Sequence, residues 1–161
     1  MSLSGFPCLS TSELRKEGIP EPWTFGHEDI VRFSELDVLN HVNNAAYVVW
    51  LENARISYFV NYGISDYVSE NRPTLVVRSL QLDYHAPLHL GQKYIVATRS
   101  AQYGRTSWTM KHAIFCDGDV KAEAACTIVT IDGKTGKSVP LNQSLIDTIS
   151  KRDSAVKRDR R

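Results

Sequence analysis

Hydrophobic and polar residues alternate over several stretches of this chain, a pattern typical of β-strands. The first such stretch is residues 23–33, and four later ones cover residues 74–84, 93–103, 107–117 and 120–132. Turn signals rich in Gly, Pro and Asp separate the later stretches at the short spacing of antiparallel strands. The pattern therefore predicts one early strand followed by a meander of four strands.

A long helix is predicted between the first strand and the others. Residues 45–62 are apolar on most sides of a helical wheel, and Gly63 follows as a C-terminal stop. A helix of this kind is expected to be enclosed by other structure. One helix with antiparallel strands argues for an α+β fold rather than an alternating parallel α/β fold.

Two smaller features are expected around this helix. Residues 64–71 are predicted to form a short second helix that ends before Pro73. Glu52 and Arg55 lie three positions apart on the long helix, a spacing at which opposite charges pair. We therefore expect them to form a structural ion pair.

Both ends of the chain have a less regular pattern. Residues 1–22 mix Ser, Gly, Pro and charge and predict an irregular N-terminal arm, with a short helical turn at 11–16. Residues 141–150 predict a short helix, and 151–161 a basic C-terminal tail with six basic and two acidic residues. We expect this tail to be solvated and frayed. With 161 residues in all, residues 1–161 fit a single domain.

Composition and charge narrow the class of protein. Hydrophobic residues make up 42% and charged residues 23%, and the net charge of +1 provides no general attraction to nucleic acid or membranes. No apolar run approaches the ~20 residues of a membrane span. The cysteines Cys8, Cys116 and Cys126 are odd in number and lack zinc-like spacing, and the N-terminus does not resemble a signal peptide. These features favour a cytoplasmic protein.

Polar side chains suited to catalysis or hydrogen bonding are concentrated between the end of the predicted first strand and the start of the long helix. Asp37, Asn40, His41, Asn43 and Asn44 follow one another within eight residues. The paired Asn residues are typical of a helix N-cap, since an amide oxygen accepts from unpaired helix N–H groups. Asp37 would then lie beside backbone amides that favour negative charge. Such an arrangement is suited to hydrolysis.

This stretch carries a family resemblance. It resembles the signature of hotdog-fold acyl-CoA thioesterases of the 4-hydroxybenzoyl-CoA thioesterase type, and is similar to a segment of acyl-ACP thioesterases. The matching pattern is Phe33-x-x-x-Asp37-x-x-x-His41-Val42-Asn43-Asn44-x-x-Tyr47-x-x-x-x-Glu52-x-x-Arg55, continued by Tyr84-x-x-Pro87-Leu88-x-x-Gly91 and Gly104-Arg105-Thr106-Ser107. The resemblance implies a curved antiparallel sheet around a central helix, a thioester hydrolase without a cofactor, and a homodimer or homotetramer with its cleft between subunits.

The resemblance also implies roles for individual residues. Asp37 is the expected catalytic carboxylate, either attacking the thioester or activating water, with His41 in proton transfer or in orienting the substrate. In acyl-ACP thioesterases an Asn lies two residues after the Asp, where this chain has Leu39 and places Asn40 one position later. Asn40, Asn43 and Asn44 are candidates for fixing the loop or contacting the substrate, Asn44 most directly.

Three further positions are expected to contact substrate. Tyr47 is a candidate for the wall of an acyl pocket, although core packing explains it as well. Backbone amides near Thr74 are the expected oxyanion donors, and Asp37 and these donors are expected to come from different subunits. Arg105 lies in a turn that matches a basic, CoA-contacting turn of the family, and an Arg fork matches phosphate oxygens.

Several alternatives remain open at this stage. In one, Asp37 caps a turn without catalysis; in another, the carrier is ACP instead of CoA; in a third, the chain binds acyl-CoA without turnover. A hotdog hydratase fits less well, because its Asp-to-His spacing is longer by one and its Gly-Asp-x-Asn-Pro pattern is absent. His85 and His89 have the spacing of helical metal ligands, but Pro87 lies between them in a predicted turn, so no metal site is expected.

Overall fold

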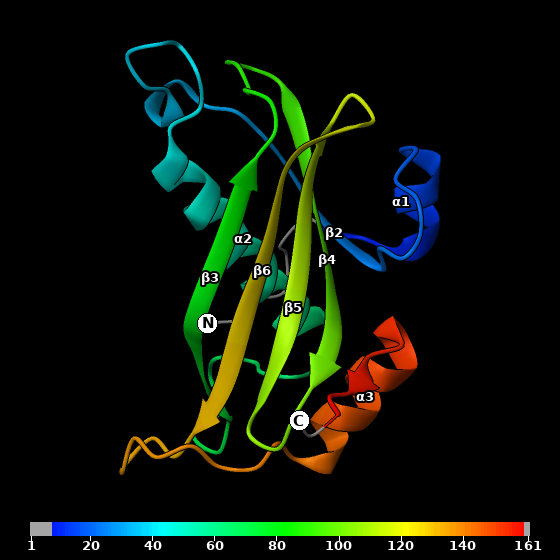
Figure 1. Ribbon diagram of the computed structural model, residues 1–161, viewed down its shortest axis with the longest axis vertical. Coiled ribbons are helices and arrows are strands. Elements are labelled where there is room, and N and C mark those ends of the chain that lie inside the picture. Colours follow the sequence, from blue (N-terminus) through cyan, green and yellow to red (C-terminus); the bar gives the residue numbers. More distant parts are fainter. Residues whose placement is uncertain (1–7, 160–161) are drawn as a thin grey trace.

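The computed structural model describes residues 8–159, and over this range the strands form one seven-stranded sheet curved around a long helix (Figure 1). The sheet order is β1-β2-β4-β5-β6-β3, and β7 pairs with β4. All pairings are antiparallel except that of β7. The strands are β1 (Cys8–Leu9), β2 (Phe25–Ile30), β3 (Thr74–Tyr84), β4 (Lys93–Tyr103), β5 (Ser107–Cys116), β6 (Asp119–Ile131) and β7 (Val156–Lys157). The helices are α1 (Thr11–Lys16), α2 (Asn44–Asn61) and α3 (Gln143–Asp153), with a 3-10 turn at Phe33–Glu35.

This arrangement confirms the predicted α+β hotdog fold. The central helix α2 lies behind the sheet in the view of Figure 1 and packs against it, while Val48 and Val49 on its other side are exposed. Trp50 of α2 stacks on Tyr94 of β4 with ring centroids 3.9 Å apart, and both rings are almost fully buried. Apolar burial of this kind is the main force that holds a helix against a sheet.

The order of strands corrects one prediction. Strands β4, β5 and β6 form a meander, but β3 pairs with β6 at the far edge of the sheet instead of with β4. Both edges of β4 are already paired, one with β2 and the other with β5. The free edge of β6 is therefore the place that remains for β3.

Two local predictions around α2 are wrong. Residues 64–71 form turns instead of a helix, because the Asp66 side chain accepts from the amides of Val68 and Ser69 and Tyr67 adopts a positive φ of 57°. Within the described residues Glu52 and Arg55 form no ion pair. Glu52 is exposed, whereas Arg55 is buried and its charge acts on Cys126 and His112 in the interior.

The ends of the chain are more ordered than predicted. The helical turn expected at 11–16 is confirmed as α1, and Cys8–Leu9 adds a short strand where an irregular arm was expected. The predicted fraying of the tail is wrong for residues 151–159, which complete α3 and form β7. Residues 1–7 of the arm and 160–161 of the tail lie outside the described range.

Asp153, at the end of α3, explains the ordered tail. Its buried carboxylate accepts hydrogen bonds from the Tyr58 hydroxyl, the Ser100 amide and the Thr24 hydroxyl. These donors come from α2, β4 and the segment before β2. A buried carboxylate that loses such donors is strongly destabilising. The native hydrogen bonds of Asp153 therefore hold the end of α3 against the sheet.

Candidate active site

The loop between the 3-10 turn and α2 holds Asp37 in a fixed orientation. Its Oδ1 accepts from the amide of Leu39 at 2.8 Å and from that of His41 at 3.2 Å. Its own amide donates to the His41 carbonyl at 2.8 Å. Within the described chain, Oδ2 has no hydrogen-bond partner, and the residue is exposed. One oxygen of the carboxylate is thus anchored while the other is open to a substrate.

Asn40 stands where the loop turns back on itself. Its φ of 58° lies in the left-handed region, which Asn tolerates better than most residues other than Gly. Its carbonyl lies 3.4 Å from Nδ1 of His89, and its amide donates to the Asp37 carbonyl. The backbone conformation therefore accounts for Asn at this position.

A second loop supports the Asp37 loop from the side. The Val42 amide donates to the Leu88 carbonyl at 2.9 Å, and the rings of His41 and His89 meet edge to face at 5.2 Å. Leu88 is fully buried beneath this contact. His89 was not predicted as part of the site. Its place beside His41 depends on the fold and has no signal in the sequence.

Asn43 and Asn44 have different roles. Asn43 is the N-cap of α2, its side-chain oxygen accepts from the Ala46 amide, and its Nδ2 donates to the Glu35 carbonyl at 2.8 Å. Glu35 in turn accepts from Nε1 of Trp50 at 2.8 Å. Asn44 is exposed on the first turn of α2. Asn43 thus connects the loop to the helix, whereas the Asn44 side chain is exposed to solvent.

Asp37, His41, Asn43, Asn44 and Tyr47 surround one hollow of about 470 Å³. The opposite wall comes from the end of β3 and the residues after it, Tyr84, His85, Ala86 and Pro87. The fold therefore brings five of the predicted site residues together. Tyr84 and Pro87 belong to the motif that carries the family resemblance, but the sequence did not indicate that they line the site.

Two aromatic rings form the apolar part of this hollow. Tyr47 and Tyr84 meet edge to face with centroids 5.1 Å apart. Burial raises the pKa of the Tyr47 hydroxyl to about 12, with a smaller contribution from Tyr84. Tyr47 is therefore neutral at physiological pH. Nearby, Nε2 of His85 lies 2.9 Å from the Glu123 carboxylate on β6.

Thr74 and Arg105 lie at the other end of the sheet. Thr74 begins β3, whose far end at Tyr84 reaches the hollow, so a strand of this length separates them by roughly 33 Å. Arg105 lies in the β4–β5 turn, at the bottom of Figure 1, whereas the Asp37 loop is at the top. Arg105 borders a different hollow, of about 600 Å³, together with Lys157 and Arg158. A single chain does not bring these two residues to Asp37.

The described part of the chain has neither a cluster of metal-ligating side chains nor a helix suited to a membrane. Among residues 8–159, no three His, Cys, Asp or Glu side chains come close enough together to hold a metal ion. None of the described helices has the length and apolar character needed to cross a bilayer.

Comparison with known proteins agrees with the fold. Residues 31–149 match the thioesterase-like superfamily. The long-chain acyl-CoA thioesterase FadM of Escherichia coli is 32% identical over 117 residues, which cover 71% of this chain and 89% of FadM. A thioesterase superfamily structure from Jannaschia superposes with a TM-score of 0.86 at 30% identity, covering 92% of this chain and 95% of that one.

A further solved structure is a thioesterase from Thermus thermophilus complexed with coenzyme A and Zn. It superposes with a TM-score of 0.74 at 32% identity, covering 84% of this chain and 98% of that one. The chain belongs to the thioesterase-like superfamily. The predicted membership of the hotdog-fold acyl-CoA thioesterase family, a family of enzymes, is thereby confirmed.

Proposed function

We propose that this enzyme hydrolyses an acyl-CoA thioester to a free acid and CoA, with Asp37 as the catalytic carboxylate. The observation that carries the proposal is the anchored Asp37 carboxylate, which borders a hollow walled by Tyr47 and Tyr84 and has one oxygen without a hydrogen-bond partner in the described chain. The similarity to a long-chain acyl-CoA thioesterase and to a CoA-bound thioesterase supports the choice of substrate.

Two routes start from this carboxylate. In the first, Oδ2 of Asp37 attacks the thioester carbonyl, the CoA thiolate leaves, and water hydrolyses the resulting anhydride. In the second, Oδ2 takes a proton from a water molecule that attacks the carbonyl directly, and the C–S bond then breaks to release the CoA thiolate. Both need donors for the oxyanion. His41 lies on the same loop and orients the substrate or returns a proton to the departing thiolate.

Within one chain, the expected oxyanion donors near Thr74 and the side chain of Arg105 lie far from Asp37. This separation favours a site shared between two chains. β3 is an edge strand with exposed Val76 and Val77, and such edges pair readily with a second strand. Antiparallel pairing of two β3 strands about a twofold axis places the Thr74 end of one chain beside the Tyr84 end of the other. Amides near Thr74 of the second chain then face Asp37. We propose a homodimer of this kind, alone or within a tetramer.

The same arrangement offers a place for the nucleotide end of CoA. Arg105, Lys157 and Arg158 border one hollow, and none of them forms an ion pair with a described acidic residue. Phosphate groups are best met by such cations. The three free thiols, Cys8, Cys116 and Cys126, fit a reducing compartment and so a cytoplasmic enzyme.

The test is thiol release from short, long and aromatic acyl-CoAs by the native chain and by Asp37→Asn. The Asn side chain still accepts from the Leu39 and His41 amides but lacks the charge, so we expect kcat to fall by about 10²–10⁴-fold while acyl-CoA still binds.

Asp66→Asn is the matched control, because Asp66 is also an exposed carboxylate that accepts from two loop amides. It should retain native activity. Full activity in Asp37→Asn would remove Asp37 from the mechanism. No release by the native chain from any acyl-CoA would exclude this substrate class and leave acyl-ACP hydrolysis or acyl-CoA binding without turnover.

A further inference from the structure

The C-terminal strand β7 belongs to a part of the chain outside the family match. The thioesterase-like superfamily matches residues 31–149, and β7 lies beyond them. Its parallel pairing with β4 places Lys157 directly opposite Tyr103. The next residue, Arg158, donates its amide to the Tyr103 carbonyl at 2.7 Å and its Nη2 to the Thr109 hydroxyl at 2.9 Å. These contacts hold two cations of the tail beside the β4–β5 turn.

The hollow of about 600 Å³ beside β7 combines positive charge with apolar surface. Three exposed cations, Arg105, Lys157 and Arg158, border it together with one acid, Asp159. Among the described residues, none of the three cations forms an ion pair. The apolar part of the lining consists of Tyr103, Pro140, Leu141 and Ile146. Cations of this kind fit phosphate oxygens, and an aromatic ring fits the face of a base.

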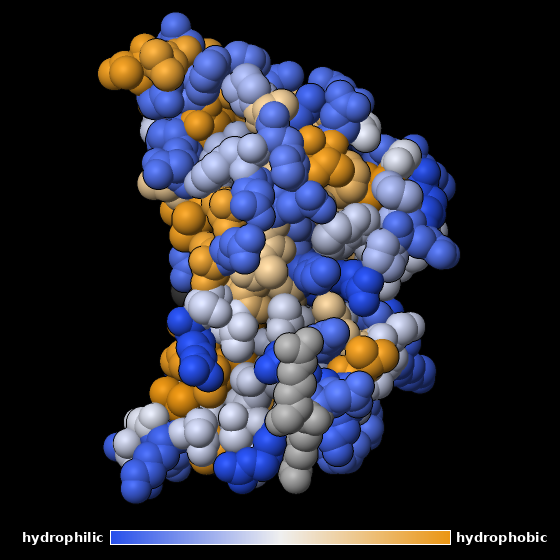
Figure 2. Space-filling model, in the orientation of Figure 1, coloured by the Kyte–Doolittle hydropathy of each residue, from blue (hydrophilic) through white to orange (hydrophobic). Residues whose placement is uncertain are grey.

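This hollow lies at the end of the sheet that holds the expected oxyanion donors. Arg105 and the start of β3 are both at the lower end of Figure 1, and Figure 2 shows mostly hydrophilic side chains at that end. In the proposed β3 dimer, the same end lies beside Asp37 of the second chain. A CoA thioester at that Asp37 then extends its nucleotide end towards the hollow, so the inference rests on the proposed function.

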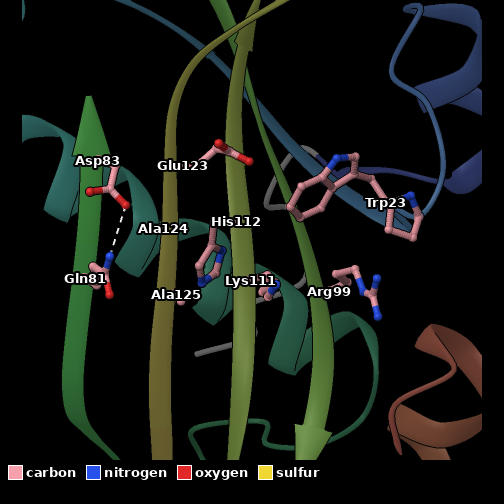
Figure 3. A pocket seen from close by; sticks show the side chains of 10 residues that line it. Trp23, Gln81, Asp83, Arg99, Lys111, His112, Glu123, Ala124 and Ala125 are labelled. Carbon is pink, nitrogen blue, oxygen red and sulfur yellow. Dashed lines mark hydrogen bonds between the residues drawn. The ribbon is translucent and has the colours of Figure 1, made fainter. Parts of the chain in front are cut away.

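A second hollow that borders cations lacks this excess of positive charge. Arg99 and Lys111 border the hollow of about 380 Å³ over the middle of the sheet, together with Asp83 and Glu123. Figure 3 shows the acids on the β3 and β6 side and the cations on the β4 and β5 side. Two cations meet two acids there, whereas three cations meet one acid beside β7. A ligand with several negative charges is therefore favoured at the β7 hollow.

We propose that β7 makes the enzyme selective for CoA as the acyl carrier. The nucleotide end of CoA carries a diphosphate and a 3′-phosphate on adenosine. Lys157 and Arg158 bind these phosphates together with Arg105, and the ring of Tyr103 supports the adenine. The pantetheine arm of a carrier protein ends in a phosphodiester on a serine, so it offers neither the 3′-phosphate nor the base.

The β7 variant Lys157→Gln with Arg158→Gln tests this role with thioesters of one acyl group on CoA, dephospho-CoA and N-acetylcysteamine. We expect KM for acyl-CoA to rise about tenfold with kcat unchanged, because a hydrogen bond to a charged group contributes about that factor. The native chain should show a similar rise in KM with the dephospho-CoA thioester. The N-acetylcysteamine thioester lacks the nucleotide, so the native chain and the variant should hydrolyse it equally.

The matched control is Lys16→Gln with Lys151→Gln, which also removes two positive charges, at exposed positions of α1 and α3. It should keep the native KM. Equal KM for acyl-CoA in the native chain and the β7 variant, or a rise shared by the control, would overturn the proposal. So would equal activity of the native chain on the same acyl group attached to CoA and to a carrier protein.

Binding of adenosine 3′,5′-bisphosphate, measured by titration calorimetry, probes the hollow without hydrolysis. The native chain and the control should bind it, and the β7 variant should bind it about tenfold more weakly. Such binding without hydrolysis of any acyl-CoA would overturn the proposed function but support the nucleotide site, and no binding by the native chain would overturn that site. Should the double variant fail to fold, as judged by circular dichroism, Lys157→Gln alone decides, because the exposed Lys157 forms no ion pair within the described chain.

Discussion

His112 is an ionisable residue that the fold keeps uncharged. It is buried on β5, where Nδ1 lies 2.9 Å from the Thr98 hydroxyl and Nε2 lies 3.5 Å from Sγ of Cys126. Burial, with the positive charge of Arg55 as a second cause, lowers the pKa of His112 to about 3. The ring is therefore neutral in the native protein throughout the physiological range.

We predict that His112 makes the protein sensitive to acid. Between pH 6.5 and about 3 the unfolded chain binds a proton at this ring that the native chain does not. The contribution of the neutral His112 to the free energy of unfolding is fully present above pH 6.5. It is lost as the pH falls towards about 3, by up to about 1.4 kcal/mol per pH unit. The free energy of unfolding, measured with urea at a series of pH values, should fall less steeply on the acid side (the acid limb) for His112→Gln than for the native chain.

Comparison between variants removes the contribution of the carboxylates, which also titrate in this range. His85→Gln is the control, because it makes the same substitution at an exposed histidine instead of the buried one. An acid limb of equal slope in His112→Gln and the native chain would show that His112 is protonated in the native state.

The helix α2 shows how one element connects stability to the site. Its N-cap Asn43 bonds both to the helix and to Glu35, and Glu35 holds the indole of Trp50. The Asp37 loop lies between these contacts. The start of α2 and the geometry of the Asp37 loop are therefore set by the same side chains.

The two neighbouring Asn residues are predicted to respond differently to substitution. Asn43→Ala removes the cap and the bond to the Glu35 carbonyl, so we expect a loss of about 1–2 kcal/mol in the free energy of unfolding and a lower kcat. Asn44→Ala should leave stability unchanged within about 0.5 kcal/mol. Chemical denaturation and acyl-CoA kinetics of both variants provide the measurement. Equal losses of stability would contradict the assignment of Asn43 as the cap.

At the scale of the whole molecule, the predicted site residues are divided between the two ends of the sheet. Asp37 and the hollow lie at one end, and Thr74 and Arg105 lie at the other. In the proposed β3 dimer, a second chain would join them, and the catalytic unit would be a pair of chains.

Specific activity should consequently depend on protein concentration. We predict that activity per chain falls on dilution below the dissociation constant of the β3 dimer. Val77→Lys, at the exposed edge strand, should shift this fall to higher concentration, because edge lysines oppose strand pairing. Ile30→Lys, equally exposed at the end of β2, should not. Activity that stays constant while sedimentation shows monomers would rule out a shared site.

The elements with strong local patterns were predictable from the sequence. The strands at 74–84 and 93–103 agree with β3 and β4, and the helix predicted at 45–62 agrees with α2 to within one residue. Alternation and helical periodicity are properties of neighbouring residues, so they can be read without knowledge of the fold. For the same reason the grouping of Asp37, His41, Asn43, Asn44 and Tyr47 followed from their closeness in the chain.

Only the tertiary structure decided what depends on distant pairs. It placed β3 beside β6, buried Asp153 against Thr24, which is 129 positions away, and brought Tyr84 and His85 to the Asp37 hollow. It also separated Thr74 and Arg105 from Asp37 within one chain. Such pairings are selected by competition among all the surfaces that can be buried together, which no local pattern records. The sequence by itself thus determined the elements with strong local patterns and the grouping of polar residues in the Asp37 loop, and the packing of the whole chain determined which distant residues meet.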